Sequence, residues 1–288
     1  MSAIAVMLLL GACSPRQLIV GQLADELAEQ SGGSELDLEL LRDAAPFHLK
    51  LSESVLSRNP AHLRLAESVA SGFTQYSYAF VAFEAEKIEA RDAKAAERLR
   101  QRAARLYERA HGHAMAALES ASPGFAKSLV RQDPQAVRIR PEWVGLAYWA
   151  AASWGGWISL SKDEPEVVAD LPVAYFLARQ AWATDPAWGN GALTSLLGSF
   201  EAARPGGSML KALAYFDQAI RQSNNAAPGP LLAKAEGYAL PQGDRALFDR
   251  LIGQALAIRE PVGNATATQN EVMRQRARWL QEKADDLF

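Results

Sequence analysis

The segment Asp92–Glu119, with the sequence DAKAAERLRQRAARLYERAHGHAMAALE, decides the fold class of this chain. It contains no proline, and apolar residues return along it every three or four positions, with arginines at the same spacing on another face. The apolar positions are Ala95, Leu99, Ala103, Leu106, Ala110, Ala114 and Ala117, and the arginines are Arg98, Arg102, Arg105 and Arg109. This pattern is typical of an amphipathic α-helix with one buried face, so it predicts a helix over 92–120.

Prolines and glycines divide the rest of the chain into pieces of helical length. The other predicted helices cover 16–30, 37–57, 61–90, 141–161, 166–185, 188–203, 207–223, 229–240, 243–258 and 269–286. Alternating strand patterns joined by Asn-Gly or Asp-Gly turns are missing from the sequence. The predicted fold class is therefore all-α.

Several of these helices carry the same short pattern before a break. The triads are Phe47-x3-Leu51-x2-Ser54, Ala110-x3-Ala114-x2-Ala117, Ala174-x3-Ala178-x2-Ala181, Ala212-x3-Phe216-x2-Ala219 and Phe248-x3-Ile252-x2-Ala255, with first positions 63, 64, 38 and 36 residues apart. The pattern resembles the second helix of a tetratricopeptide repeat, whose period is about 34 residues. We expect stacked antiparallel helix hairpins, a degenerate tetratricopeptide-like α-solenoid with a concave face. An alanine-rich bundle without repeats is the alternative.

Four glycines lie inside predicted helices: Gly72, Gly155, Gly198 and Gly237. A glycine in the middle of a helix costs roughly 1 kcal/mol against alanine. The cost is understandable where a neighbouring helix approaches closely, so we expect tight contacts at these positions.

Composition and charge exclude several classes of protein. The chain has 288 residues, about half of them apolar, with a formal net charge of −3, one cysteine and four histidines. It can bury a sizeable core, and its charge argues against a general nucleic-acid partner. A single cysteine excludes an internal disulfide and a multi-thiolate metal site. Because no catalytic motif or metal-binding spacing is present, we expect neither an enzyme nor a cofactor, and His111 and His113 are interpreted as surface side chains.

The N-terminus has the form of a lipoprotein signal. The apolar run Ala3–Leu10 is too short to span a bilayer, which takes about 20 apolar residues. The following Leu10–Cys13, LGAC, resembles a bacterial lipobox, although no Lys or Arg precedes the apolar run. We expect a signal peptide over 1–12, a lipidated N-terminus with linker or first helix over 13–36, and one helical repeat domain over 37–288. Ser14 after Cys13 favours the outer membrane.

Clustered aromatic residues provide the candidate binding positions. They gather in the segments 72–80 and 143–157. Such rings are either core or the lining of a ligand or partner channel. The channel candidates are Gln75, Tyr76, Tyr78, Tyr148, Trp149, Trp154, Trp157 and, as an anion contact at a helix end, Arg204.

Several blocks along the chain carry a resemblance to a known family. They are Ala70–Phe80, the LYERA block from Leu106, Tyr148–Gly155, Ile158–Asp163, Val168–Pro172, Ser199–Gly207, Arg276–Leu280 and Asp285–Phe288. Through them, nearly the whole chain after Cys13 resembles the TatT component family of tripartite ATP-independent periplasmic (TRAP) transporters.

The resemblance implies a periplasmic, lipid-anchored helical protein that associates with the transporter's substrate-binding subunit. It also implies a homotrimer pierced by hydrophobic channels. Only Cys13 carries over as a defined functional position. The leading hypothesis is an accessory subunit that docks the binding subunit and helps to transfer a small apolar or organic-acid ligand. The alternatives are a general envelope scaffold and an independent carrier of a small apolar ligand.

Overall fold

The computed structural model describes residues 22–28, 34–259, 261 and 263–288, and within these ranges it contains helices and turns but no strand. The all-α prediction is confirmed. The expected signal peptide 1–12 and Cys13 lie outside the described residues. The assignment of 37–288 to a single domain stays a prediction, as does the tetratricopeptide repeat.

The observed helices follow the predicted ones closely. They are α2 (Leu38–Leu56), α3 (Leu63–Tyr76), α4 (Phe83–Ile88), α5 (Ala93–Ala121), α6 (Phe125–Val130), α7 (Val144–Leu160), α8 (Pro165–Ala169), α9 (Leu171–Thr184), α10 (Ala192–Ala203), α11 (Met209–Gln222), α12 (Pro228–Lys234), α13 (Arg245–Ala257), α14 (Ala267–Glu282) and α15 (Ala284–Leu287). Short 3-10 turns η2 (Pro141–Trp143) and η3 (Trp188–Gly191) precede α7 and α10. The π-helical segments η1 (Ser77–Ala82) and η4 (Ala235–Ala239) interrupt two predicted continuous helices, and α6 was not expected.

Side-chain caps begin several helices where the sequence predicted a start. Asp92 accepts a hydrogen bond from the backbone N–H of Ala95 at 2.8 Å, and Ser208 and Asp244 cap α11 and α13 in the same way. Such caps satisfy backbone donors that the first turn of a helix leaves unpaired.

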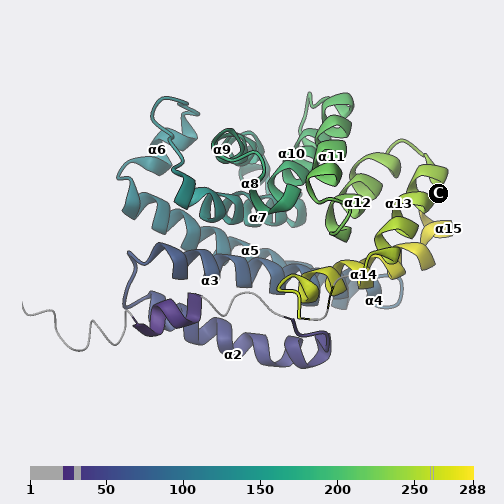
Figure 1. The fold of residues 1–288 in the computed structure, drawn as a ribbon, viewed down its shortest axis with the longest axis horizontal. Helices are drawn as coiled ribbons and strands as arrows, with labels where there is room; N and C mark the ends of the chain where they lie inside the picture. The colour runs from purple at the N-terminus through teal and green to yellow at the C-terminus, as the bar shows by residue number, and fades with distance from the viewer. Residues whose placement is uncertain (1–21, 29–33, 260, 262) are drawn as a thin grey trace, which may run out of the picture.

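Helices adjacent in sequence pack side by side to build an elongated stack (Figure 1). Helices α3, α5 and α7 contact one another and form its centre, and α10 to α13 extend it. The last long helix, α14, returns beside α4, so the C-terminal part of the chain touches the N-terminal part (Figure 1).

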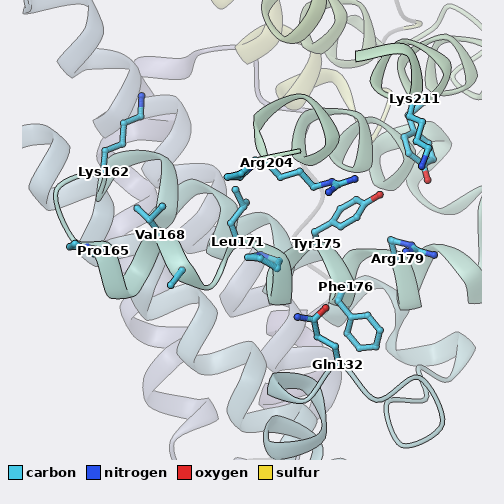
Figure 2. A pocket seen from close by; sticks show the side chains of 14 residues that line it. Gln132, Lys162, Pro165, Val168, Leu171, Tyr175, Phe176, Arg179, Arg204 and Lys211 are labelled. Carbon is cyan, nitrogen blue, oxygen red and sulfur yellow. The ribbon is translucent and has the colours of Figure 1, made fainter. Parts of the chain in front are cut away.

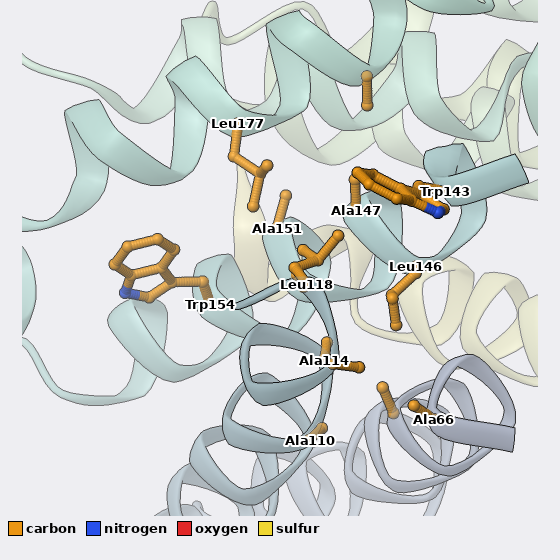
Figure 3. Packing of buried hydrophobic residues seen from close by; sticks show 14 of the residues in the cluster. Ala66, Ala110, Ala114, Leu118, Trp143, Leu146, Ala147, Ala151, Trp154 and Leu177 are labelled. Carbon is orange, nitrogen blue, oxygen red and sulfur yellow. The ribbon is translucent and has the colours of Figure 1, made fainter. Parts of the chain in front are cut away.

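Two large apolar clusters form the core. The first joins α3, α5, α7, α9 and α10, where small alanines allow the helices to approach (Figure 3). The second joins α12, η4, α13 and α14. The apolar residues of four predicted triads, those that begin at Ala110, Ala174, Ala212 and Phe248, are all buried.

The triad that begins at Phe47 does not follow this rule. Phe47 is 77% exposed and Leu51 is 38% exposed. Helix α2 instead buries residues such as Leu49, Val55 and Leu56 against the stack. Helix α2 therefore contacts its neighbours through a face other than the one that carries Phe47 and Leu51.

All four mid-helix glycines face a neighbouring side chain at close range, as predicted. A Cβ atom would lie 2.5 Å from Leu49 at Gly72 and 3.0 Å from Phe200 at Gly155. At Gly198 and Gly237 it would lie 2.7 Å and 2.8 Å from the ring of Phe216. The Phe216 ring is fully buried, and these two glycines flank it.

Replacement of Gly198 by alanine should destabilise the protein, although alanine favours helix. The new methyl group would clash with the Phe216 ring, which cannot move away because Gly237 also lies against it. Overpacking of this kind costs about 1–3 kcal/mol. Gly253→Ala in α13 is the matched control, because no atom lies within 4 Å of its added Cβ. This control should stabilise by about 0.5–1 kcal/mol. Chemical denaturation measures both, and an equal gain for both variants would contradict the close packing.

Candidate functional site

A cavity of about 870 Å³ opens between α8, α9 and the start of α11 (Figure 2). Its lining residues combine cations with aromatic and aliphatic side chains. They are Gln132, Lys162, Pro165, Val168, Ala169, Leu171, Pro172, Tyr175, Phe176, Arg179, Arg204, Pro205, Lys211 and Tyr215. Pockets of a few hundred to about 1,000 Å³ that are mostly apolar with a few polar groups are typical of small-ligand sites.

A buried carboxylate fixes the wall of this cavity. Glu201, fully buried in α10, accepts hydrogen bonds from Arg204 Nη2 at 2.7 Å and Arg204 Nε at 3.1 Å. It also accepts from the hydroxyl of Tyr175 at 2.6 Å and the backbone N–H of Ser208 at 2.9 Å. Four donors therefore satisfy both oxygens, and the network joins α9, α10 and α11.

Ionisation of Glu201 is strongly favoured by these contacts. Burial opposes the charged form, but the bonds from Arg204, Tyr175 and Ser208 outweigh it and lower the pKa of Glu201 to about 2. Burial and the bond to Glu201 raise the pKa of Tyr175. The guanidinium of Arg204 also lies over the Tyr175 ring, 5.0 Å from its centroid, so both side chains are held in one orientation.

The sequence after α10 explains how these groups meet. Gly206 has a φ of 71°, and the N–H of Gly207 donates to the carbonyl of Arg204 at 3.0 Å. A Cβ at Gly207 would lie 2.0 Å from the carbonyl oxygen of Glu201. Pro205–Gly207 thus forms a turn after α10 that places the backbone N–H of Ser208 within hydrogen-bond distance of Glu201.

Among the predicted candidates, Arg204 lines this cavity. Trp157 lines a second, smaller cavity of about 310 Å³ between α5 and the end of α7. Four carboxylates border that second cavity, from Glu97, Glu108, Asp163 and Glu164. The two cavities therefore differ in the sign of the charge around them.

The other candidates of α7 pack against nearby rings. Trp154 is 5% exposed, and its ring centroid lies 4.3 Å from that of His111. The ring of Tyr148 lies 4.8 Å from Trp149 and 4.5 Å from Trp188. Burial raises the pKa of Tyr148 to about 12, which indicates a ring surrounded by apolar groups.

The candidates before α4 lie in a different part of the stack. The amide of Gln75 donates to the hydroxyl of Ser71 at 2.7 Å, and the rings of Tyr76 and Phe80 lie 5.5 Å apart. Tyr78, on η1, belongs to a cluster with α14 in which the Arg276 guanidinium lies 5.7 Å from its ring centroid. Burial raises the pKa of Tyr78. A common channel through all these rings stays a prediction.

The interpretation as surface side chains is wrong for His111, whereas His113 is partly exposed. The ring of His111 is enclosed between α5 and α7, with Nδ1 3.2 Å from the carbonyl oxygen of Ala150. Burial lowers the pKa of His111 to about 4, against a small opposing effect of this hydrogen bond. His113 Nε2 lies 2.7 Å from Glu53 of α2, which also binds Arg109. Both imidazoles therefore join helices.

Sequence reasoning missed Tyr175, Arg179 and Lys211 in the larger cavity. Tyr175 and Arg179 are four residues apart on α9, which places them on one helical face, and Lys211 lies in the first turn of α11. That spacing was visible in the sequence. The sequence does not show, however, which face of α9 lies toward the turn between α10 and α11.

A helical stack with a cavity of this composition is typical of binding proteins. The family model of the TRAP transporter T-component matches residues 34–288, so the chain belongs to that family. A protein of Treponema pallidum (strain Nichols), named only as an uncharacterized protein, is 28% identical over 314 residues, which cover 99% of this chain and 96% of that protein.

Membership of this family supports an accessory role in TRAP transport and a periplasmic, membrane-associated location. The family is one of transporter accessory components and is not known as enzymatic. Among the described residues, no helix is both long and apolar enough to cross a membrane. Within the same residues, no three His, Cys, Asp or Glu side chains are grouped as a metal site would need.

Glu201→Gln should lower the free energy of unfolding at pH 7 by about 2–4 kcal/mol, because Arg204 and Tyr175 lose a charged partner. The folded pKa of Glu201, about 2, lies below its ordinary value of 4.5. Its stabilisation is thus complete above about pH 4.5 and is lost as the pH falls toward 2. The difference between wild type and variant should therefore shrink from pH 7 to pH 3 in urea denaturation.

Glu142→Gln is the control for this measurement, since its side chain is 63% exposed. It should change the free energy of unfolding by less than about 0.5 kcal/mol. A Glu201→Gln variant as stable as the control at pH 7 would contradict the bracing role of Glu201.

Proposed function

We propose that this protein is a lipid-anchored periplasmic accessory subunit of a TRAP transporter that binds the substrate-binding subunit and assists transfer of a small ligand. The observation that carries the proposal is the T-component match, which covers residues 34–288 and thus nearly all of the described helical body. A rigid stack offers a large fixed surface to a partner, and the cavity beside Arg204 offers space for a ligand.

Anchoring is proposed through Cys13. The sequence before it has the length and small-residue ending of a signal peptide. Two or three acyl chains hold a protein stably at a membrane, whereas one chain gives marginal binding. With Ser14 as the next residue, we assign the anchor to the outer membrane.

Self-association is proposed through the exposed face of α2. Its apolar side chains Leu40, Phe47 and Leu51 are seven and four residues apart, Leu36 lies just before the helix, and each of the four is at least 38% exposed. Helix α2 lies at the margin of the stack (Figure 1). An apolar stripe of this length is a typical protein contact, and we assign it to the contact between copies in a homotrimer.

Purification of the native protein from detergent-solubilised membranes should recover the TRAP substrate-binding subunit, identified by mass spectrometry. The Cys13→Ser variant tests membrane anchoring separately from binding to the substrate-binding subunit. It should lack the acyl mass but still bind the subunit, because the helical body is unchanged. Repeated recovery of the wild-type protein without the subunit would refute the proposed partner.

Phe47→Glu should convert the trimer to monomers in light scattering, because a charge cannot be buried between copies without a partner. The side chain is 77% exposed in the single chain, so the stability of the monomer should change by less than about 0.5 kcal/mol. Val130→Glu on α6, at a site 67% exposed, is the control and should remain trimeric. If both variants stay trimeric, α2 is not the contact.

A further inference from the structure

The larger cavity has an excess of positive charge that the protein itself does not neutralise. Lys162, Arg179, Arg204 and Lys211 line it, and no carboxylate does among the described residues. Glu201, which is not part of the lining, forms an ion pair with Arg204 and neutralises its charge. Arg179 and Lys211 are exposed and form no ion pair with any described residue. The interaction of such a site with an anion is therefore attractive before any contact forms.

Arg204 is oriented for a ligand before one arrives. Its Nε and Nη2 atoms donate to the fully buried Glu201. A guanidinium has five N–H donors, so the remaining ones are available on the side away from Glu201. Because Glu201 already holds the guanidinium, the Arg204 side chain loses little conformational freedom when a ligand binds. The planar guanidinium matches a planar anion such as a carboxylate.

Three of the four cationic groups are gathered at one end of the cavity. Figure 2 shows Arg179, Arg204 and Lys211 around the ring of Tyr175. Val168 and Pro165 lie toward the other end together with the fourth cation, Lys162, and Leu171 lies between the two ends. A hydrated inorganic anion would use the first end and leave the aliphatic end without a partner. A ligand with a charged head and an apolar body contacts both.

We propose that this cavity binds a small organic carboxylate, with its carboxylate between Arg179, Arg204 and Lys211 and its apolar body over Val168 and Leu171. This proposal names the chemical class of the ligand that the protein would transfer. Binding itself is independent of the proposed function, and only the role of the ligand as a transported substrate rests on it. The smaller cavity is excluded as the carboxylate site, since four carboxylates border it.

The test uses 3-phenylpropionate and its uncharged isostere 3-phenylpropionamide, titrated calorimetrically into the full chain in detergent micelles. The carboxylate should bind saturably, at least tenfold more tightly than the amide, because hydrogen bonds to a charged group are about twice as strong as neutral ones. Equal affinities, or no saturable binding of the carboxylate, would overturn the proposal.

A double variant, Arg179→Gln with Lys211→Gln, locates the binding. Both side chains are exposed and form no ion pair with a described residue, so the variant should fold and yet lose at least tenfold in carboxylate affinity. Affinity for the amide should stay the same. The control is Arg250→Gln, an exposed position on α13 away from the cavity lining, which should bind as wild type does. An unchanged affinity in the double variant would overturn the location.

Failure of this inference is distinguishable from failure of the proposed function. If the substrate-binding subunit is recovered but no carboxylate binds, only the proposed ligand class is refuted. If a carboxylate binds but that subunit is not recovered, the proposed transport role is refuted and the proposed carboxylate site still stands.

Discussion

The close contact of Phe216 with two glycines is the constraint on which the geometry of the C-terminal half depends. The ring is fully buried between Gly198 of α10 and Gly237 of η4. Gly198 follows Leu197 of the first apolar cluster, and Gly237 lies between Ala235 and Ala239 of the second. One aromatic side chain of α11 therefore packs between elements that belong to the two different cores, where α10 also contacts α12 and η4 directly. Because interiors are close-packed, the ring fixes the distance between these helices.

The same contact positions the binding site. Glu201 is three residues beyond Gly198 on α10, and Lys211 lies on the helix that carries Phe216. A fixed angle between α10 and α11 therefore fixes Arg204 and Lys211 relative to Tyr175 on α9. A second contact holds the C-terminal part from the other side, where Arg276 of α14 binds Glu86 of α4 at 3.1 Å and also pairs with Glu236. Burial of this polar cluster restricts the arrangements available to the chain.

Much of the fold was predictable because its determinants are local. Helical periodicity, breakers and mid-helix glycines depend on neighbouring residues, and the structure agrees with them apart from α6 and the π-helical segments η1 and η4. The site was less predictable, because it depends on which helical faces meet. Arg204 was identified from its place at a helix end, but Tyr175 and Lys211 acquire their roles only through packing. The enclosure of His111 was missed for the same reason, because the sequence of α5 does not show that α7 covers this side chain.

Native-state hydrogen exchange of the backbone amides in α10, α11 and η4 tests the central claim most directly. If Phe216 joins the two cores, the slowest amides of these segments should exchange only through global unfolding, with the same free energy of opening as those of α5 and α7. Exchange of α11 and η4 by a local opening several kcal/mol less costly than that of α5 would show two independently stable halves. The cavity would then have no fixed wall.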